Sequence, residues 1–211
     1  MNEKTKTLWL GGAILALYNN NIPVSAARMA VLSNLLLLSD TEGKTMISYR
    51  KLSEITGVAY GSISTAVSDF EKIGAITKKE QLSEDGVKRG KGSLPQVIAF
   101  VPDIIESEYS EQELHWLSIA ASVLASYEKI GSARISLLLY LLKNINKLSK
   151  EVYWFDDIAK DSKIAYATVA TAMKTLITHG CLNKKKDLYT LKMKCDGDIQ
   201  MIAYKYMSKK G

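Results

Sequence analysis

Residues 56–74 read TGVAYGSISTAVSDFEKIG, and this stretch decides the fold that we expect for the chain. Gly57 tolerates the positive φ that ends one helix just before another begins, so the stretch predicts two helices joined by a tight turn. Within residues 60–72, apolar residues recur at i, i+3, i+4 and i+7, the spacing of one buried helical stripe. Gly74 is expected to end this third helix. The stripe consists of Ile63, Ala66, Val67 and Phe70.

The face of the third helix outside this stripe carries short or polar side chains. Groups of this kind fit the groove of a nucleic acid and hydrogen-bond to phosphates or to base edges. We therefore treat this face as a candidate DNA-reading surface. Its members are Tyr60, Ser62, Ser64, Thr65 and Ser68.

The flanking sequence predicts the rest of one compact unit. A helix is expected over residues 26–38, a short strand at 46–47, and a second helix over 49–55 that Ser48 caps. After Gly74, two β-rich segments, residues 75–79 and 97–101, enclose a basic loop rich in glycine, which predicts a β-hairpin. The hairpin's candidate phosphate contacts are Lys78, Lys79, Lys88, Arg89 and Lys91.

The chain matches itself at an offset of 106 residues. Residues 27–79 align with residues 133–185 without a gap, and 13 of the 53 paired positions are identical. Ala59-Tyr60 pairs with Ala165-Tyr166, and Gly74 pairs with Gly180. The identities cluster around the turn and the third helix, so we interpret them as two copies of one unit.

The second copy predicts helices over residues 132–146, 156–160 and 166–178, with a short strand at 152–154. Two pairings stay open for its hairpin: residues 181–186 with 188–193, or residues 188–194 with 199–206. The candidate DNA contacts of this copy are Tyr166, Thr168, Ala170, Thr171, Lys174, Lys184 and Lys185.

The remaining segments predict the domain organisation. Residues 8–17 follow two lysines and have the outline of a signal peptide, but a related segment recurs at 114–124, so we expect a buried helix. Ser110 and Glu113 form a capping box that starts a helix expected to reach Lys129. We therefore divide the chain into a first domain (1–102), an acidic linker (103–109) and a second domain (110–211).

Composition and charge narrow the function classes. The net charge is +6, from 28 Lys+Arg and 22 Asp+Glu, which suits a polyanionic partner. The spacing of the cysteines and histidines is not that of metal ligands, so we expect no metal and no cofactor. These residues are Cys181, Cys195, His115 and His179. Two unpaired cysteines suit the reducing cytoplasm, and ten apolar residues are too few for a membrane span.

Residues 56–67 and 70–76 together resemble the winged-helix family of bacterial transcription regulators. The resemblance implies a mainly α fold with small β-hairpin wings, present here as two tandem winged-helix domains. Tandem winged helices are also similar to plasmid replication initiators, which bind repeated DNA sites. Ala59 and Ala165 depart from the family by occupying the helix N-cap, where Ser or Thr is frequent.

From this resemblance we expect a double-stranded DNA-binding protein, in first place a transcriptional regulator. A plasmid or phage replication initiator, or a winged-helix module that binds protein, are the alternatives, and no enzymatic site is recognisable. Two reading helices in one chain favour an intrachain pseudo-dimer, although a homodimer stays open.

Single residues carry further expectations. For Tyr60 and Tyr166 both packing and DNA contact stay open, whereas Arg28 and Arg134 are expected either in a structural salt bridge or on a helix surface. We expect core or interface positions for Trp9, Trp116 and Trp154.

Overall fold

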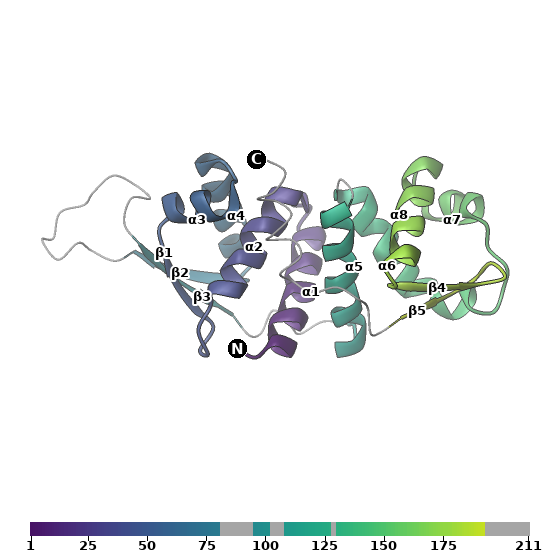
Figure 1. The fold of residues 1–211 in the computed structure, drawn as a ribbon, viewed down its shortest axis with the longest axis horizontal. Coiled ribbons are helices and arrows are strands. Elements are labelled where there is room, and N and C mark those ends of the chain that lie inside the picture. Colours follow the sequence, from purple (N-terminus) through teal and green to yellow (C-terminus); the bar gives the residue numbers. More distant parts are fainter. Residues whose placement is uncertain (81–94, 102–107, 128–129, 193–211) are drawn as a thin grey trace, which may run out of the picture.

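The computed structural model describes residues 1–80, 95–101, 108–127 and 130–192. In this part of the chain the molecule is mainly helical, with small antiparallel sheets at its two ends (Figure 1). The first half contains α1 (Glu3–Asn19), α2 (Ala26–Leu38), β1 (Lys44–Ile47), α3 (Tyr49–Thr56), α4 (Tyr60–Lys72), β2 (Ile76–Glu80) and β3 (Gln96–Phe100). The second half contains α5 (Glu111–Tyr127), α6 (Ser132–Leu148), α7 (Phe155–Ser162), α8 (Tyr166–Thr178), β4 (Leu182–Lys185) and β5 (Leu188–Leu191).

The order of elements is the same in the two halves apart from β1, which has no counterpart among the described strands. Helices α3 and α7 start and end 106 positions apart, and so do α4 and α8. The bounds predicted for α2, α4 and α8 are confirmed without change. Helix α5 is described as far as Tyr127, and the predicted end at Lys129 lies outside the described residues.

The strand pairings of both predicted hairpins are present in the structure. Strand β3 pairs with both β1 and β2, and β4 pairs with β5, each time antiparallel. The first of the two pairings considered for the second hairpin is therefore confirmed. Lys186 and Asp187 turn it with φ values of 50° and 60°, as a two-residue type I′ turn requires.

The strand expected at residues 152–154 is wrong. That segment has no strand assignment, although the Tyr153 N–H donates to the Asp187 carbonyl at 3.1 Å. Tyr153 points inward and is buried, whereas Val152 and Trp154 are exposed on either side of it. Alternate residues of an extended segment face opposite ways, so an inward Tyr153 turns Trp154 outward. Trp154 is 60% exposed, and the core or interface position expected for it is wrong.

Trp9 and Trp116 are fully buried, as expected, and each anchors a central helix. The Trp9 indole N–H donates to the Val101 carbonyl at 3.0 Å, and that of Trp116 donates to the Cys181 carbonyl at 2.8 Å. A buried indole N–H needs such a partner. These bonds attach α1 to the end of β3, and α5 to the segment that leads into β4.

Helices α1 and α5 run side by side in the same direction through the middle of the molecule (Figure 1). Lys4 and Glu111, in the first turns, pair at 2.6 Å, and the Ser136 hydroxyl donates to the Tyr18 hydroxyl at 3.2 Å near the other end. Gly11 lies directly against the backbone of Leu114. The predicted burial of residues 8–17 is thereby confirmed: the segment forms the contact between the two halves.

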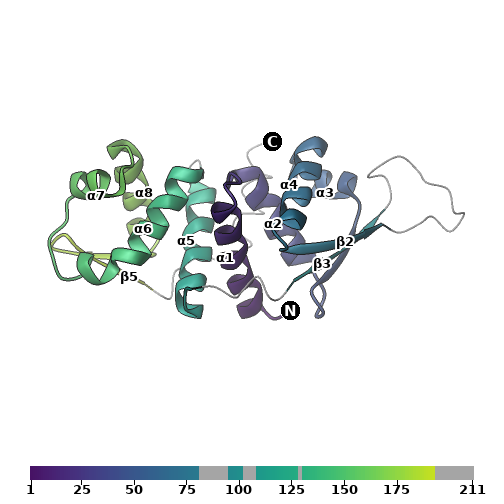
Figure 2. The same ribbon diagram turned by 180° about the vertical axis from the view of Figure 1, so that it is seen from behind.

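The view from behind repeats the arrangement with the halves exchanged. Helices α2 and α8 lie toward the viewer in Figure 1, and their counterparts α6 and α4 do so in Figure 2. The halves are thus related by an approximate twofold rotation about an axis parallel to α1 and α5. Helices α3 and α7 lie at one edge of the molecule, called here the upper edge after Figure 1.

Substitution of Gly11 tests the close α1–α5 contact. A Cβ at Gly11 would lie within van der Waals overlap of the Leu114 carbonyl oxygen, and this backbone cannot move without shifting a helix. We expect Gly11→Ala to lower the free energy of unfolding by about 1–3 kcal/mol. Chemical denaturation monitored by circular dichroism measures this change.

Gly61→Ala is the matched control, because Gly61 is also helical and a Cβ there meets nothing within 4 Å. It is expected to leave stability unchanged or to raise it by up to about 1 kcal/mol, the helix propensity gain of alanine. Equal effects of the two substitutions would contradict the close helix contact.

The predictions for Arg28 and for the start of α5 are confirmed. Arg28 donates through Nε and Nη2 to the Asp69 carboxylate at 2.9 and 2.5 Å, which fixes α2 against α4. The capping box before α5 is present, with the Ser110 N–H donating to Glu113 at 2.8 Å. The predicted linker lies mostly outside the described residues. Among the described residues, no helix is long and apolar enough to span a bilayer, and no cluster of metal ligands occurs.

Candidate nucleic-acid interface

The turn between α3 and α4 is fixed by side-chain hydrogen bonds. Gly57 takes the left-handed conformation at φ 65°, and the Ser53 hydroxyl donates across the turn to the Val58 carbonyl at 2.6 Å. Thr56 accepts from the Val58 N–H at 3.1 Å. These contacts hold the start of α4 in one orientation relative to α3.

In the second half Lys163 takes the place of Gly57 and adopts φ 58°. A non-glycine residue in the left-handed conformation destabilises the fold modestly. The residue that adopts this conformation here is a lysine. The Lys163 side chain is exposed. The turn before α8 therefore presents a positive charge that the turn before α4 does not have.

Helix α4 exposes the polar face predicted for it. Tyr60 is 41% exposed, Ser62, Thr65 and Ser68 are exposed, and Ser64 is half-buried. The Tyr60 ring also lies near the buried Tyr49, with ring centroids 6.1 Å apart. Tyr60 therefore packs against Tyr49 and is also partly accessible to a ligand.

Helix α8 exposes a similar face, with one correction. Tyr166 is 52% exposed, Thr171 and Lys174 are exposed, and Thr168 is half-buried. Ala170 is only 9% exposed, so its predicted place on the outward face is wrong. Ala170 lies at the margin of the apolar stripe, where a single methyl group is too short to project beyond its neighbours.

Thr65 and Thr171, at equivalent positions, each donate their hydroxyl proton to a carbonyl of their own helix. Thr65 donates to the Gly61 carbonyl at 3.0 Å, and Thr171 donates to the Ala167 carbonyl at 2.6 Å. Each oxygen keeps lone pairs that accept, and each residue keeps a methyl group. Without breaking these bonds, the threonines suit a base-edge donor or a thymine methyl, and not a phosphate.

The N-cap residues of α4 and α8 provide no side-chain cap. Ala59 and Ala165 occupy these positions, as predicted, and alanine offers no side-chain acceptor to the first N–H groups of the helix. Uncapped N–H groups at a helix start attract anions such as phosphate. Alanine at the N-cap therefore removes a competitor for these donors.

The lysines of the two hairpins fall into two pairs of equivalent residues. Lys78 contacts Glu71 at 2.7 Å, and Lys184 contacts Asp187 at 2.6 Å. The hydrogen bond that Lys184 donates to Asp187 raises the pKa of Lys184, and the same ammonium lies over the Phe155 ring. These two lysines are held by the fold.

Lys79 and Lys185 differ from that pair. Both are exposed, and neither forms an ion pair with a residue that the structure describes. They are therefore the better candidates for phosphate contact in the two hairpins. Lys88, Arg89 and Lys91 lie outside the described residues.

The sequence reasoning missed the first turn of α3. Arg50 and Lys51 are exposed there, directly after the Ser48 cap, whereas the same turn of α7 carries Asp156 and Asp157. The signal is present in the sequence, because Arg50 and Lys51 follow the predicted cap Ser48 directly at the start of a predicted helix. The two halves therefore present charges of opposite sign beside α4 and α8.

Comparison with known proteins connects the second half with plasmid replication. Residues 103–196 match the model of a family described as Firmicute plasmid replication protein (RepL). The matched range, somewhat less than half of the chain, contains every element from α5 to β5. The match favours the replication alternative over the transcriptional role placed first from the sequence. No curated protein and no solved structure matches the chain.

Proposed function

We propose that this chain is a DNA-binding protein of plasmid replication, which recognises an origin through α4 and α8. The similarity of residues 103–196 to the RepL family carries the replication part of the proposal. The exposed polar faces of α4 and α8 support the DNA-binding part. In this proposal each half is a winged-helix unit, with α4 or α8 as reading helix and the following hairpin as wing.

The approximate twofold axis supports an intrachain pseudo-dimer. Helices α3 and α7 lie at the same upper edge, and α4 and α8 begin directly after them (Figure 1). One duplex along this edge meets both reading helices. Two such helices enter successive major grooves when their half-sites are about one helical turn apart.

The charges beside the reading helices support an asymmetric site. Arg50 strengthens phosphate contact at α3, where Lys51 also contacts Glu54 at 3.3 Å, whereas Asp156 and Asp157 weaken phosphate contact at α7. Helix α8 compensates with Lys174 and with Lys163 at its turn. The half-sites are therefore not expected to be identical.

Equilibrium DNA binding tests the proposal. In fluorescence anisotropy with mixed duplexes, affinity is expected to fall about 100-fold or more between about 50 and about 200 mM salt, because several phosphates are neutralised. An interaction module that binds protein alone would show no binding at the lower salt. Binding that does not change with salt would equally contradict the proposal.

The wing lysines provide a sharper prediction. Lys79→Gln and Lys185→Gln are each expected to reduce the slope of log affinity against log salt by about 1, because each removes one phosphate contact. Lys78→Gln and Lys184→Gln are the matched controls in the same strands. Their ammonium groups already face a carboxylate, so the slope is expected to change by less than half as much. Equal changes in all four variants would show that the ion pairs do not separate these lysines.

A further inference from the structure

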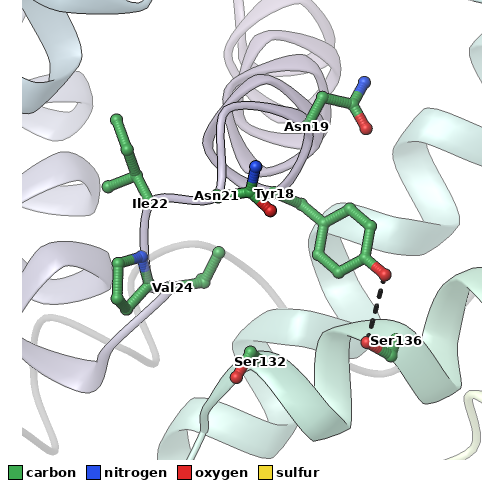
Figure 3. A pocket seen from close by; sticks show the side chains of 8 residues that line it. Tyr18, Asn19, Asn21, Ile22, Val24, Ser132 and Ser136 are labelled. Atoms are coloured by element: carbon green, nitrogen blue, oxygen red, sulfur yellow. Dashed lines mark hydrogen bonds between the residues drawn. The ribbon is translucent and has the colours of Figure 1, made fainter.

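An open cavity of about 580 Å³ lies between the two halves (Figure 3). The C-terminal end of α1 and the loop after it form one side, and the first turns of α6 form the other. Figure 3 looks along α1 and shows the Tyr18 ring directed at Ser136 across this space. The Ser136 hydroxyl donates to that of Tyr18, which links the two walls.

The cavity lies at the upper edge, between the two reading helices. Helix α1 runs from the opposite edge up to this one, and α6 starts here (Figures 1 and 2). The cavity is therefore near the approximate twofold axis, which is parallel to α1. A duplex that places α4 and α8 in successive major grooves presents its intervening minor groove at this point.

The lining suits base edges better than phosphates, because every residue that lines the cavity is uncharged. Asn19 and Asn21 are exposed at its rim, and their amides form no hydrogen bond with a described residue. Asn20 differs, since its amide donates to the Ala16 carbonyl at 2.9 Å and does not line the cavity. Two amides with uncommitted donors thus border a hollow on the proposed DNA side.

We propose that this cavity faces the minor groove between the half-sites, and that Asn19 and Asn21 donate there to base acceptors of A·T pairs. The inference rests on the proposed DNA-binding function. In the minor groove, A·T pairs present only the acceptors adenine N3 and thymine O2, whereas G·C pairs add the guanine amino donor. That amino group projects into the groove beside the base acceptors and keeps the amide N–H groups away from them, so the rim selects A·T pairs at the centre of the site.

Base substitution in the preferred duplex tests the selection directly. After selection of that duplex from a random pool with the full chain, the central pairs between the half-sites are changed from A·T to G·C and to inosine·C. G·C is expected to weaken binding about tenfold. Inosine·C has the major groove of G·C without the minor-groove amino group, so it is expected to restore most of the affinity.

Protein variants identify the side chains responsible. Asn19→Ala combined with Asn21→Gly removes both amides, and glycine keeps the left-handed backbone that Asn21 adopts at φ 55°. This double variant is expected to bind the A·T and G·C duplexes within about twofold of each other. Asn20→Ala, the matched control in the same turn, is expected to retain the tenfold preference.

The outcomes separate this inference from the proposed function. Salt-dependent binding of the wild type without a central preference, or a preference that the double variant retains, overturns the cavity's role and leaves DNA binding in place. An inosine·C duplex that binds as weakly as G·C overturns it too. Failure of the wild type to bind any duplex overturns the proposed function itself.

Discussion

A plasmid that depends on the cognate origin is expected to disappear from a growing culture when this protein is withdrawn. The physical reason is that replication requires a protein assembled on the origin, and the match of residues 103–196 assigns similarity to such proteins. The gene is supplied from a separate replicon under an inducible promoter, and the origin-bearing plasmid is counted by selective plating. After about ten generations without inducer, we expect loss from nearly all cells, because each division at least halves the copies per cell.

The control for this experiment is an unrelated plasmid in the same cells, which must persist. A second arm supplies the chain with Thr171→Glu and Lys174→Glu, which places carboxylates on the exposed face of α8. We expect this variant to fail in maintenance as completely as withdrawal does. Stable inheritance of the origin without the protein would contradict the replication proposal and return the transcriptional role to first place.

The same pair of substitutions has the second large expected effect, on DNA affinity. Thr171 and Lys174 are exposed on α8, so glutamates there bring new negative charge toward phosphates without disturbing the core. Juxtaposed like charges cost several kcal/mol, which corresponds to a loss of about 100-fold in affinity. Fluorescence anisotropy at about 50 mM salt measures the loss, since screening is weak there.

A matched control separates this contact from the effect of net charge. Lys143→Glu with Asn146→Glu also changes the charge by three units, at exposed positions three residues apart in α6. These residues lie in the C-terminal half of that helix, away from the proposed DNA edge. A change of less than about fivefold is expected. If both double variants lose affinity equally, α8 is not the contact surface.

The helices could be predicted from the sequence where their signals are local. Helices α4 and α8 have an apolar stripe of the right period and a glycine that follows the helix end, and both bounds are correct. The sequence does not distinguish two strand pairings for the second hairpin, because its short alternating segments can pair equally well with either neighbour. The turn at Lys186 and Asp187, with positive φ at both residues, distinguishes them in the structure.

The contact between the halves could not be predicted. Helices α1 and α5 start 108 positions apart instead of 106, so they lie outside the gap-free repeat. Their parallel packing depends on Gly11 lying against the Leu114 backbone, a long-range contact that no local pattern encodes. The approximate twofold axis, and the cavity beside it, follow from this contact.

Part of the candidate site was predictable, and the errors have a common cause. Ala170 and Trp154 were placed by helix spacing and by residue type, but exposure also depends on side-chain length and on neighbouring segments. Similarly, equivalent lysines cannot be ranked from sequence, because the ion pair of Lys78 with Glu71 forms between a strand and a helix. Replication and transcription also use the same DNA-binding chemistry, so the motif alone could not rank them.

Footprinting of the preferred duplex with two double variants tests most directly whether α4 and α8 of one chain bind two separate half-sites. One variant changes Ser64 and Thr65 to alanine on α4, and the other changes Thr171 and Lys174 to alanine on α8. The wild type is expected to protect two major-groove segments about one helical turn apart. Each variant is expected to lose protection at a different segment. Loss at the same segment in both variants, or protection of one groove by the wild type, would contradict two reading helices in one chain.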